Sequence, residues 1–394
     1  MHENHNALGV ATGQKPTQPV TLVRPHAAHR AARYFLEKFP GTSMYAVKAN
    51  PSPDLIRSLW DAGITHFDVA SIAEVRLVRS QLPTAVLCFM HPVKGQEAIA
   101  EAYHVHGVRT FSLDSLTELE KIVVATDGAT DLTLCVRLRV SSSHSKLSLA
   151  SKFGIAADEA APLLMATRQV ADALGICFHV GSQAMSPQAY AEALAQVRIA
   201  IVAAGVTVDV VDVGGGFPSI YPGMEPTALD GYFEVIHRAY EALPVSYSAE
   251  LWCEPGRALS AEYASVLVRV EARKDDVLYI NDGAYGALFD AAHVAWRFPV
   301  ALVRETPSRA KTMEFSFYGP TCDDMDFMRG PFELPADTQA GDYIEVGMLG
   351  AYGSAMRTGF NGFTAGATVL ARDEPMDTAY GVVETSPSKV ISIR

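Results

Sequence analysis

Short apolar segments alternate with longer amphipathic segments over the first two thirds of the chain. Eight apolar segments are typical of buried strands and cover residues 43–48, 66–71, 85–90, 110–113, 133–140, 177–180, 206–213 and 248–253. Apolar residues at helical spacing fill the gaps, for example over residues 27–39, 54–62, 116–124, 156–174 and 187–204. Because two parallel strands need a crossover between them, this alternation predicts an α/β fold with a TIM-like (β/α)8 barrel.

The pattern changes beyond about residue 259. Segments rich in β-branched and aromatic residues then follow one another through Gly- and Pro-containing turns, and they cover residues 263–272, 276–281, 309–318, 343–346 and 367–372. They predict a mostly antiparallel β domain. We divide the chain into a barrel over residues 24–258 and a β-rich domain formed by residues 1–23 and 259–394. We assign no helix or strand to the polar leader.

The 394 residues carry a formal net charge of -12, and 49% of them are hydrophobic. This charge argues against nucleic acid or an anionic membrane as a partner, because both attract clustered Lys and Arg. No apolar run is long enough to span a bilayer, and the polar first residues lack the hydrophobic segment of a signal peptide. We therefore expect a cytoplasmic protein that acts on small molecules.

The five cysteines contain no Cys-x-x-Cys pair, so the sequence predicts neither a disulfide framework nor a zinc site. Four of them lie in apolar, strand-like segments, where a free Cys usually packs as a small apolar residue. These four are Cys88, Cys135, Cys177 and Cys253. Cys322 differs because it lies in a loop-forming stretch. His2 and His5 have no further ligands nearby, and we interpret them as part of a mobile terminus rather than a metal site.

Lys48 ends the first apolar segment, shortly before the Asn50-Pro51 pair, which cannot continue a strand. It should therefore stand at the carboxyl end of its strand, where barrel enzymes place their chemistry. A desolvated lysine in that position can form a Schiff base with an aldehyde cofactor. The alternative is a lysine whose side chain extends from the strand end into solvent.

Other chemically useful residues follow later strands, and the same rule gathers them at one barrel mouth: Asp68, Arg137, His179, Gly214 to Gly216, Glu254 and Arg257. The triple glycine offers backbone N–H groups suited to a phosphate, although a tight turn would use the same residues. Glu254 can hold the nitrogen of a pyridine ring in its protonated form, which favours loss of carbon dioxide. His179 can stack on such a ring, or it can be structural.

Motifs along nearly the whole chain follow the order of one known family. They are YAVKAN (45–50), FDVAS (67–71) with Glu74, KFG (152–154), HVGS (179–182), GGGF (214–217), EPGR (254–257), NDG (281–283) with YG (285–286), GPTCD (319–323), and GAY (350–352) with FNGF (360–363). On these motifs the chain resembles the fold-type III pyridoxal-phosphate decarboxylases of the ornithine, diaminopimelate and arginine decarboxylase group. It is most similar to the ornithine branch. The barrel of that family resembles that of alanine racemase.

The resemblance implies pyridoxal 5′-phosphate as the cofactor and gives roles to the matching residues. Lys48 would hold the cofactor as a Schiff base, His179 would stack on its ring, and Glu254 would pair with the ring nitrogen. The phosphate would be held by Ser182, Gly215, Gly216, Gly256, Arg257 and Tyr352. A polar network around the lysine would consist of Asp68, Glu74 and Arg137. We choose Arg137 over Arg139 because its distance to the KFG motif matches the family spacing.

Substrate choice depends on fewer residues. Cys322 is followed by Asp323, as in the ornithine and lysine branch, whereas diaminopimelate enzymes have a glutamate at the second position. Asp290 matches the acid that this branch uses for the distal ammonium of the substrate, although a helix cap is the alternative role. Two carboxylates suit a cationic side chain and repel an anionic one. Tyr285 completes the predicted substrate site.

The resemblance thus implies decarboxylation of L-ornithine to putrescine in polyamine biosynthesis, with Cys322 returning a proton to the α-carbon. Cys322 and Asp323 would enter the active site of the neighbouring subunit, which implies a homodimer with shared sites at its interface. A lysine or dual lysine/ornithine decarboxylase is the nearest alternative, because the segment from Tyr285 to Asp290 is shorter than in eukaryotic ornithine decarboxylases. A diaminopimelate decarboxylase, a racemase and a non-catalytic regulatory homologue are further alternatives.

Overall fold

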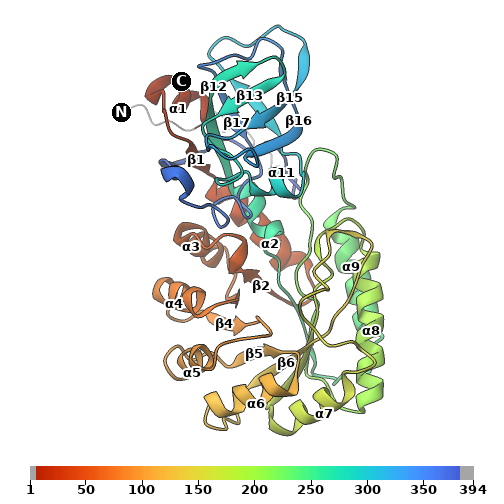
Figure 1. Cartoon of the computed structure of the whole chain (residues 1–394). Coiled ribbons are helices and arrows are strands. Elements are labelled where there is room, and N and C mark those ends of the chain that lie inside the picture. The colour runs from red at the N-terminus through yellow and green to blue at the C-terminus, as the bar shows by residue number, and fades with distance from the viewer. Residues whose placement is uncertain (1–5, 382–394) are drawn as a thin grey trace, which may run out of the picture.

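In the computed structural model, residues 6–381 are described, and they form a barrel with a separate sheet at one end (Figure 1). The barrel is closed by parallel strands in the order β10-β11-β2-β3-β4-β5-β6-β8. These strands are β2 (Thr42–Ala46), β3 (His66–Val69), β4 (Val86–Phe89), β5 (Thr110–Leu113), β6 (Thr133–Arg137), β8 (Ala173–Cys177), β10 (Val210–Asp212) and β11 (Glu250–Cys253). The predicted parallel eight-stranded barrel is confirmed.

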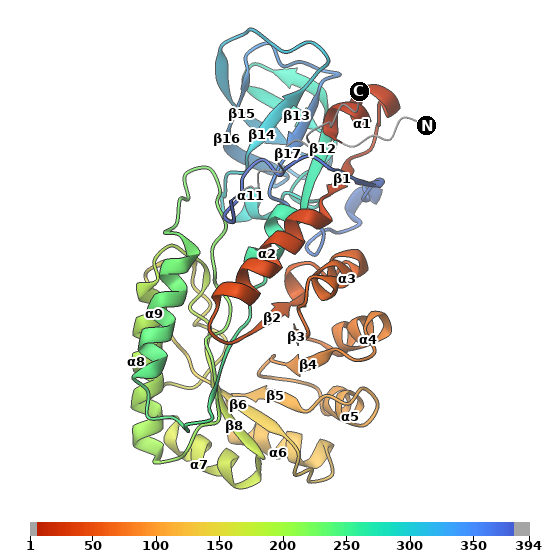
Figure 2. The ribbon, with the colours of Figure 1, turned by 180° about the vertical axis from the view of Figure 1, so that it is seen from behind.

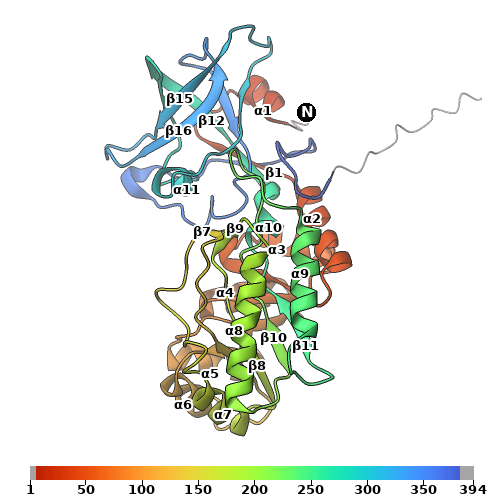
Figure 3. The same ribbon diagram turned by 90° about the vertical axis from the view of Figure 1, so that its right-hand side faces the viewer.

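Helices cover the outside of the barrel, as Figure 3 shows for α8 and α9. Their bounds are α2 (Pro25–Lys38), α3 (Pro53–Asp61), α4 (Ile72–Gln81), α5 (Gln96–His104), α6 (Leu116–Ala125), α7 (Ala161–Val170), α8 (Gln188–Ala204) and α9 (Leu229–Glu241). Each has buried apolar residues on one side, for example Leu55, Ile56 and Leu59 of α3, which is the pattern that predicted these helices. Figure 2 shows α2 leading from the sheet to the barrel.

Sulfur-containing side chains fill part of the barrel interior. Cys88, Cys135 and Cys177 are buried and free there, together with Met44 and Met90. Cys253 is likewise buried and free, so the four strand cysteines pack as predicted. Gly175 on β8 pairs with Cys135 on β6, and an added Cβ on Gly175 would lie 2.4 Å from the Cys135 sulfur. Any side chain at this position of β8 would press against that sulfur.

The sixth barrel strand begins and ends earlier than predicted. We expected a helix over residues 156–174 and a strand over 177–180, but α7 ends at Val170 and β8 spans Ala173–Cys177. The prediction was wrong because Leu163, Leu164, Thr167, Ala171 and Leu174 continue a helical spacing into the strand. Neither proline nor glycine interrupts the chain at the true boundary.

The second domain is built on a mixed sheet in which most strand pairs are antiparallel, as predicted. The path β14-β17-β12-β13-β15-β16 is extended by β1, which pairs with β12 and β18. Its strands are β1 (Val20–Val23), β12 (Ala264–Lys274), β13 (Val277–Ile280), β14 (Val300–Val303), β15 (Thr312–Tyr318), β16 (Phe327–Pro335), β17 (Tyr343–Val346) and β18 (Thr368–Leu370). The sequence analysis did not find β14 or β16, which are interrupted or bounded by prolines and glycines.

The leader before α2 contains two elements that we did not assign, helix α1 (Ala7–Gln14) and strand β1. The Asn6 side chain caps α1 by accepting the N–H of Gly9. The pairing of β1 with β12 agrees with our grouping of residues 1–23 with the second domain, whose boundaries remain a prediction. His2 and His5 lie outside the described residues. No helix within residues 6–381 is long and apolar enough to cross a membrane.

Candidate active site

Lys48 and Asp68 meet at the carboxyl ends of neighbouring barrel strands. Lys48 follows β2 in a short 3₁₀ turn (Val47–Ala49), and its Nζ lies 2.7 Å from the Asp68 Oδ2 at the end of β3. Asp68 is buried, whereas 39% of the Lys48 side chain is exposed. Burial acts to lower the pKa of Lys48, but the carboxylates of Asp68 and Glu254 outweigh it and raise that pKa. Because Lys48 is paired with Asp68, its side chain does not extend freely into solvent, which was the alternative.

Glu74 and Arg137 lie near this pair without a direct hydrogen bond to it. The Glu74 carboxylate accepts the N–H of Ala70 at 2.6 Å, while its own N–H donates to the Ser71 hydroxyl, so the acid belongs to the cap of α4. Arg137 ends β6, and no hydrogen bond or ion pair engages its guanidinium within residues 6–381. Arg139 is exposed, so Arg137 is the arginine nearer the barrel interior.

Glu254 follows β11 and lies beside Asp212, the last residue of β10. Both side chains are buried, and the two carboxyl groups act on each other electrostatically. Burial, and then the neighbouring Asp212 carboxyl, raises the pKa of Glu254 well above its usual value. Burial also raises the pKa of Asp212 to about 6. One oxygen of each carboxyl has no hydrogen-bond donor among the described residues, so Glu254 offers a vacant, buried acceptor.

His179 follows β8 and faces the triple glycine. Its Nδ1 accepts the N–H of Gly181 at 3.0 Å, which leaves the ring proton on Nε2. Burial, together with the charge of Arg137 and of Lys48, lowers the pKa of His179 well below its usual value. The imidazole is therefore neutral near pH 7. An added Cβ on Gly215 would lie 3.0 Å from the His179 Nε2, so a side chain there would collide with the ring.

The triple glycine and the turn after β11 present unpaired amides. Within the described chain, the N–H groups of Gly215, Gly216 and Gly256 donate to no other protein group. Gly216 has φ +103°, and an added Cβ would lie 2.5 Å from the Gly181 carbonyl oxygen. Ser182 begins the short strand β9 (Ser182–Ala184), close to the same turn. This arrangement suits an anion better than the plain tight turn that was the alternative.

Arg257 lies among aromatic rings next to these amides. Its guanidinium carbon is 4.2 Å from the ring centre of Trp296, 4.8 Å from that of Tyr352 and 5.8 Å from that of Tyr221. Its Nη1 donates to the Tyr221 hydroxyl at 3.1 Å, and its Nη2 lies 3.1 Å from the Asp290 Oδ2. The buried Nε finds no acceptor among residues 6–381. One donor of this arginine thus remains available.

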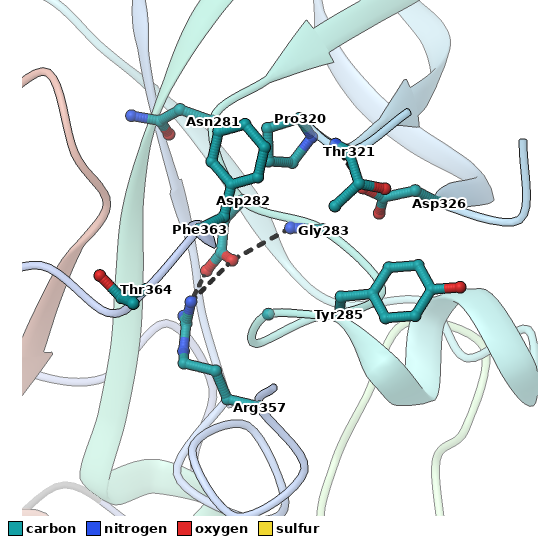
Figure 4. A pocket seen from close by; sticks show the side chains of 11 residues that line it. Asn281, Asp282, Gly283, Tyr285, Pro320, Thr321, Asp326, Arg357, Phe363 and Thr364 are labelled. Carbon is teal, nitrogen blue, oxygen red and sulfur yellow. Dashed lines mark hydrogen bonds and ion pairs between the residues drawn. The ribbon is translucent and has the colours of Figure 1, made fainter. Parts of the chain in front are cut away.

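The remaining predicted residues lie in the second domain. Tyr285 donates a short hydrogen bond to Asp323, and the backbone N–H of the adjacent Cys322 donates to Asn361 at 3.1 Å. In Figure 4 the Tyr285 side chain points away from the Asp282–Arg357 ion pair. No contact in the described chain joins Tyr285, Cys322 or Asp323 to Lys48. Within a single chain, these three residues therefore do not complete the site around the lysine.

The chain matches the family model described as the pyridoxal-dependent decarboxylase, pyridoxal binding domain, over residues 26–261. This match covers more than half of the chain. The chain belongs to the pyridoxal-dependent decarboxylase family. Its cofactor is pyridoxal 5′-phosphate.

Two curated members of this family cover most of the chain. A lysine/ornithine decarboxylase of Selenomonas ruminantium is 32% identical over 342 residues, which are 84% of this chain and 84% of the relative. An ornithine decarboxylase of Cricetulus griseus is 31% identical and covers 87% of this chain and 78% of its own length. Among solved structures, the Paramecium bursaria Chlorella virus arginine decarboxylase bound to agmatine has a TM-score of 0.82 and 26% identity. It covers 92% of this chain and 98% of its own.

The residues at the barrel mouth fit the cofactor of this decarboxylase family. The vacant acceptor on Glu254 matches the N–H of a protonated pyridine ring. The unpaired amides of Gly215, Gly216 and Gly256, with the Arg257 side chain, match a phosphate group. The Lys48 amine is held at the same mouth by its hydrogen bond to Asp68. The structure thus brings the predicted cofactor residues of this decarboxylase to one place.

Sequence reasoning missed Asp212, Tyr221 and Trp296. Asp212 stands in the run Val210 to Val213, where its position at a strand end was the only available signal. Tyr221 and Trp296 lie in stretches without regular structure, and no periodicity marks them. Their role follows only from the fold, which packs both rings against Arg257.

Proposed function

We propose that this decarboxylase acts on cationic L-amino acids and converts L-ornithine to putrescine. The observation that carries the proposal is the Asp290 carboxylate, which is largely buried at the barrel mouth beside Arg257 and close to the cofactor residues. A carboxylate there favours an ammonium group at the far end of the substrate and disfavours a second carboxylate. The names of the relatives support a basic amino acid in general.

Each residue of the proposed site has a separate role in the reaction. Bound at this site, pyridoxal phosphate supplies an electron sink for the electron pair that remains when carbon dioxide leaves. Lys48 contributes the amine that binds the cofactor aldehyde. Glu254 accepts a hydrogen bond from the ring nitrogen and keeps it protonated, so the sink stays strong. His179 contributes a neutral ring, which can stack without adding a positive charge.

A proton must return to the α-carbon after carbon dioxide leaves, and Cys322 is the proposed donor. We propose that the active unit is a homodimer in which the partner subunit's Cys322 and the partner's Asp323 complete the site. Large apolar side chains are exposed near this loop: 62% of Met325, 41% of Phe360 and 44% of Phe363. An apolar surface of this kind suits contact with a second subunit.

A lysine or dual-specificity decarboxylase is the second candidate. The specific observation in its favour is the short segment from Tyr285 to Asp290, since a shift of this acid would change the length of diamine that fits. A racemase is disfavoured because Glu254, an acid, faces the ring nitrogen position. A non-catalytic homologue is disfavoured because Lys48, Glu254 and the phosphate-binding residues are all present.

A side-by-side product assay tests the proposal. The cofactor-loaded protein is offered L-ornithine, L-lysine, L-arginine and meso-diaminopimelate separately, and amines are identified by mass spectrometry. Putrescine as the main product is expected, and Lys48→Ala should form none. Cadaverine in equal or larger amount would establish the second candidate, and the absence of any amine would refute the decarboxylase assignment. Asp61→Asn, on the exposed end of α3, is a matched control that should behave like wild type.

A further inference from the structure

Two buried carboxyl groups, those of Asp212 and Glu254, stand at the ends of adjacent barrel strands. Asp212 ends β10 and Glu254 follows β11, its parallel neighbour, whose Trp252 pairs with Asp212. The exposed fraction is 0% for Asp212 and 2% for Glu254. Their backbones are tied together, because the Glu254 N–H donates to the Gly214 carbonyl at 2.9 Å. The two side chains therefore come from adjacent strand ends, and both are buried.

Each of the two acids has a buried side-chain oxygen that receives no hydrogen bond from the described residues. These two atoms are the Asp212 Oδ2 and the Glu254 Oε1. An ionised carboxylate can only accept, so two ionised carboxylates cannot hydrogen-bond to each other. A proton on either acid would supply a donor to the other. In the cofactor-free chain, one proton held between the two groups supplies the missing donor, and the Glu254 oxygen becomes an acceptor for the ring N–H once that proton is passed on.

No cationic side chain of the described chain forms a hydrogen bond or ion pair with these two acids. The titratable and charged side chains that act on it are Asp68, Lys48, Arg137, Cys88, Cys135, Cys177 and Cys253. Lys48 is hydrogen-bonded to Asp68 instead, and Arg137 makes no ion pair in the described chain. Two buried negative charges without a bonded cation are costly, which again favours retention of a proton.

We propose that Asp212 is a positioning residue that shares one proton with Glu254 and holds the Glu254 carboxyl group toward the cofactor ring. This inference rests on the proposed role of Glu254. The Asp212 Oδ1 also accepts the Gly214 N–H at 2.8 Å, so one side chain fixes both the acid and the start of the glycine turn. Before the cofactor binds, Asp212 and Glu254 together already hold the proton that the nitrogen of the pyridine ring needs.

Infrared spectroscopy of the full-length, cofactor-stripped chain in D2O tests the shared proton directly. At neutral pH the wild type should show the carbonyl stretch of a protonated carboxylic acid. Asp212→Asn should lose this band, because the asparagine amide can donate to an ionised Glu254 and still accept from Gly214. Glu254→Gln should lose it for the corresponding reason. The control Asp209→Asn removes a carboxylate that pairs with Arg168 outside this cluster, and it should keep the band.

Calorimetry of pyridoxal-phosphate binding in buffers of different ionisation enthalpy gives a second readout. If Glu254 is ionised in Asp212→Asn, the ring nitrogen must take its proton from solvent. Proton uptake should therefore exceed that of wild type by close to one proton per site, while Asp209→Asn should match wild type.

The absence of a carboxylic acid band in wild type, or a band that survives both active-site substitutions, would overturn the proposal. Equal proton uptake in wild type and Asp212→Asn would overturn it as well. If Asp212→Asn does not fold, Glu254→Gln decides the infrared test alone. None of these measurements depends on turnover, so failure of the ornithine assignment would show in the product assay and not here.

Discussion

Arg257 and Asp290 form an ion pair of 3.1 Å at the barrel mouth, and this pair joins two sites that the sequence treats as separate. Arg257 was predicted to bind the cofactor phosphate, and Asp290 was predicted to bind the distal ammonium of the substrate. Both side chains are largely buried. A change at either residue should therefore be examined for effects on cofactor and substrate together.

The first prediction concerns Asp290→Asn, which removes the charge but keeps an oxygen that can accept from Arg257. Loss of a charged hydrogen-bond partner costs about 1.5–3 kcal/mol, so KM for ornithine should rise roughly 10- to 150-fold. Cofactor affinity should be at least that of wild type, because Tyr221 and the stacked rings still hold Arg257. Steady-state kinetics and a fluorescence titration measure the two quantities. An unchanged KM together with weakened cofactor binding would mean that Asp290 positions Arg257 and does not bind the substrate.

The second prediction concerns the pH dependence of cofactor attachment in Asp68→Asn. The Asp68 carboxylate raises the pKa of Lys48 and so favours its charged form, whereas attachment to an aldehyde needs the neutral amine. Removing that carboxylate takes away the largest of the effects that raise the pKa of Lys48, while burial still acts to lower it, so this pKa should fall. The midpoint of attachment, followed by visible absorbance, should move to lower pH than in wild type. A midpoint that moves upward would contradict the assigned role of Asp68.

The third prediction tests the shared site by mixing two inactive variants, Lys48→Ala and Cys322→Ala. If sites are shared, random exchange makes half of the dimers mixed, and each mixed dimer has one intact site. Activity should return to about a quarter of the wild-type value at equal amounts. Mixing Lys48→Ala with Asp68→Ala is the matched control, because both substitutions fall on the same side of the site. Recovery in neither mixture would refute the shared-site arrangement.

The fourth prediction concerns the barrel interior. Gly175→Ala places a methyl group against the Cys135 sulfur, and overpacking of this kind costs about 1–3 kcal/mol in the free energy of unfolding. Cys135→Ala removes that sulfur, so the double variant should recover part of the loss, as chemical denaturation would measure. Additive losses in the double variant would show that the two positions do not share space.

Rules for strand ends predicted much of the site. Lys48, Asp68 and Glu254 were found because each follows an apolar strand, and parallel strands bring their carboxyl ends to one mouth. Residues that contribute through packing were not found. Trp296 has no distinguishing local pattern, and it reaches Arg257 only because the second domain folds against the barrel.

The ends of some helices and strands were predicted wrongly because the same apolar residues fit both a helix and a buried strand. The helix before β8 was extended because Ala171 and Leu174 keep a helical spacing, and parallel strands buried on both faces have no alternation to oppose it. The helix α1 was missed because Gly9 and Gly13 lie within it and weaken any helical pattern, although Val10 and Ala11 are buried.

The pairing of β1 with β12 has a consequence for how the chain can be made. Val20 pairs with Leu267, so nearly the whole barrel is synthesised between two adjacent strands of the other domain. The barrel can fold as soon as its own strands have emerged from the ribosome, but β1 has no partner until much later. Contacts of such long sequence separation form slowly, and an unpaired strand can join other chains meanwhile. Newly made chains should therefore be most vulnerable to aggregation through β1 during this interval.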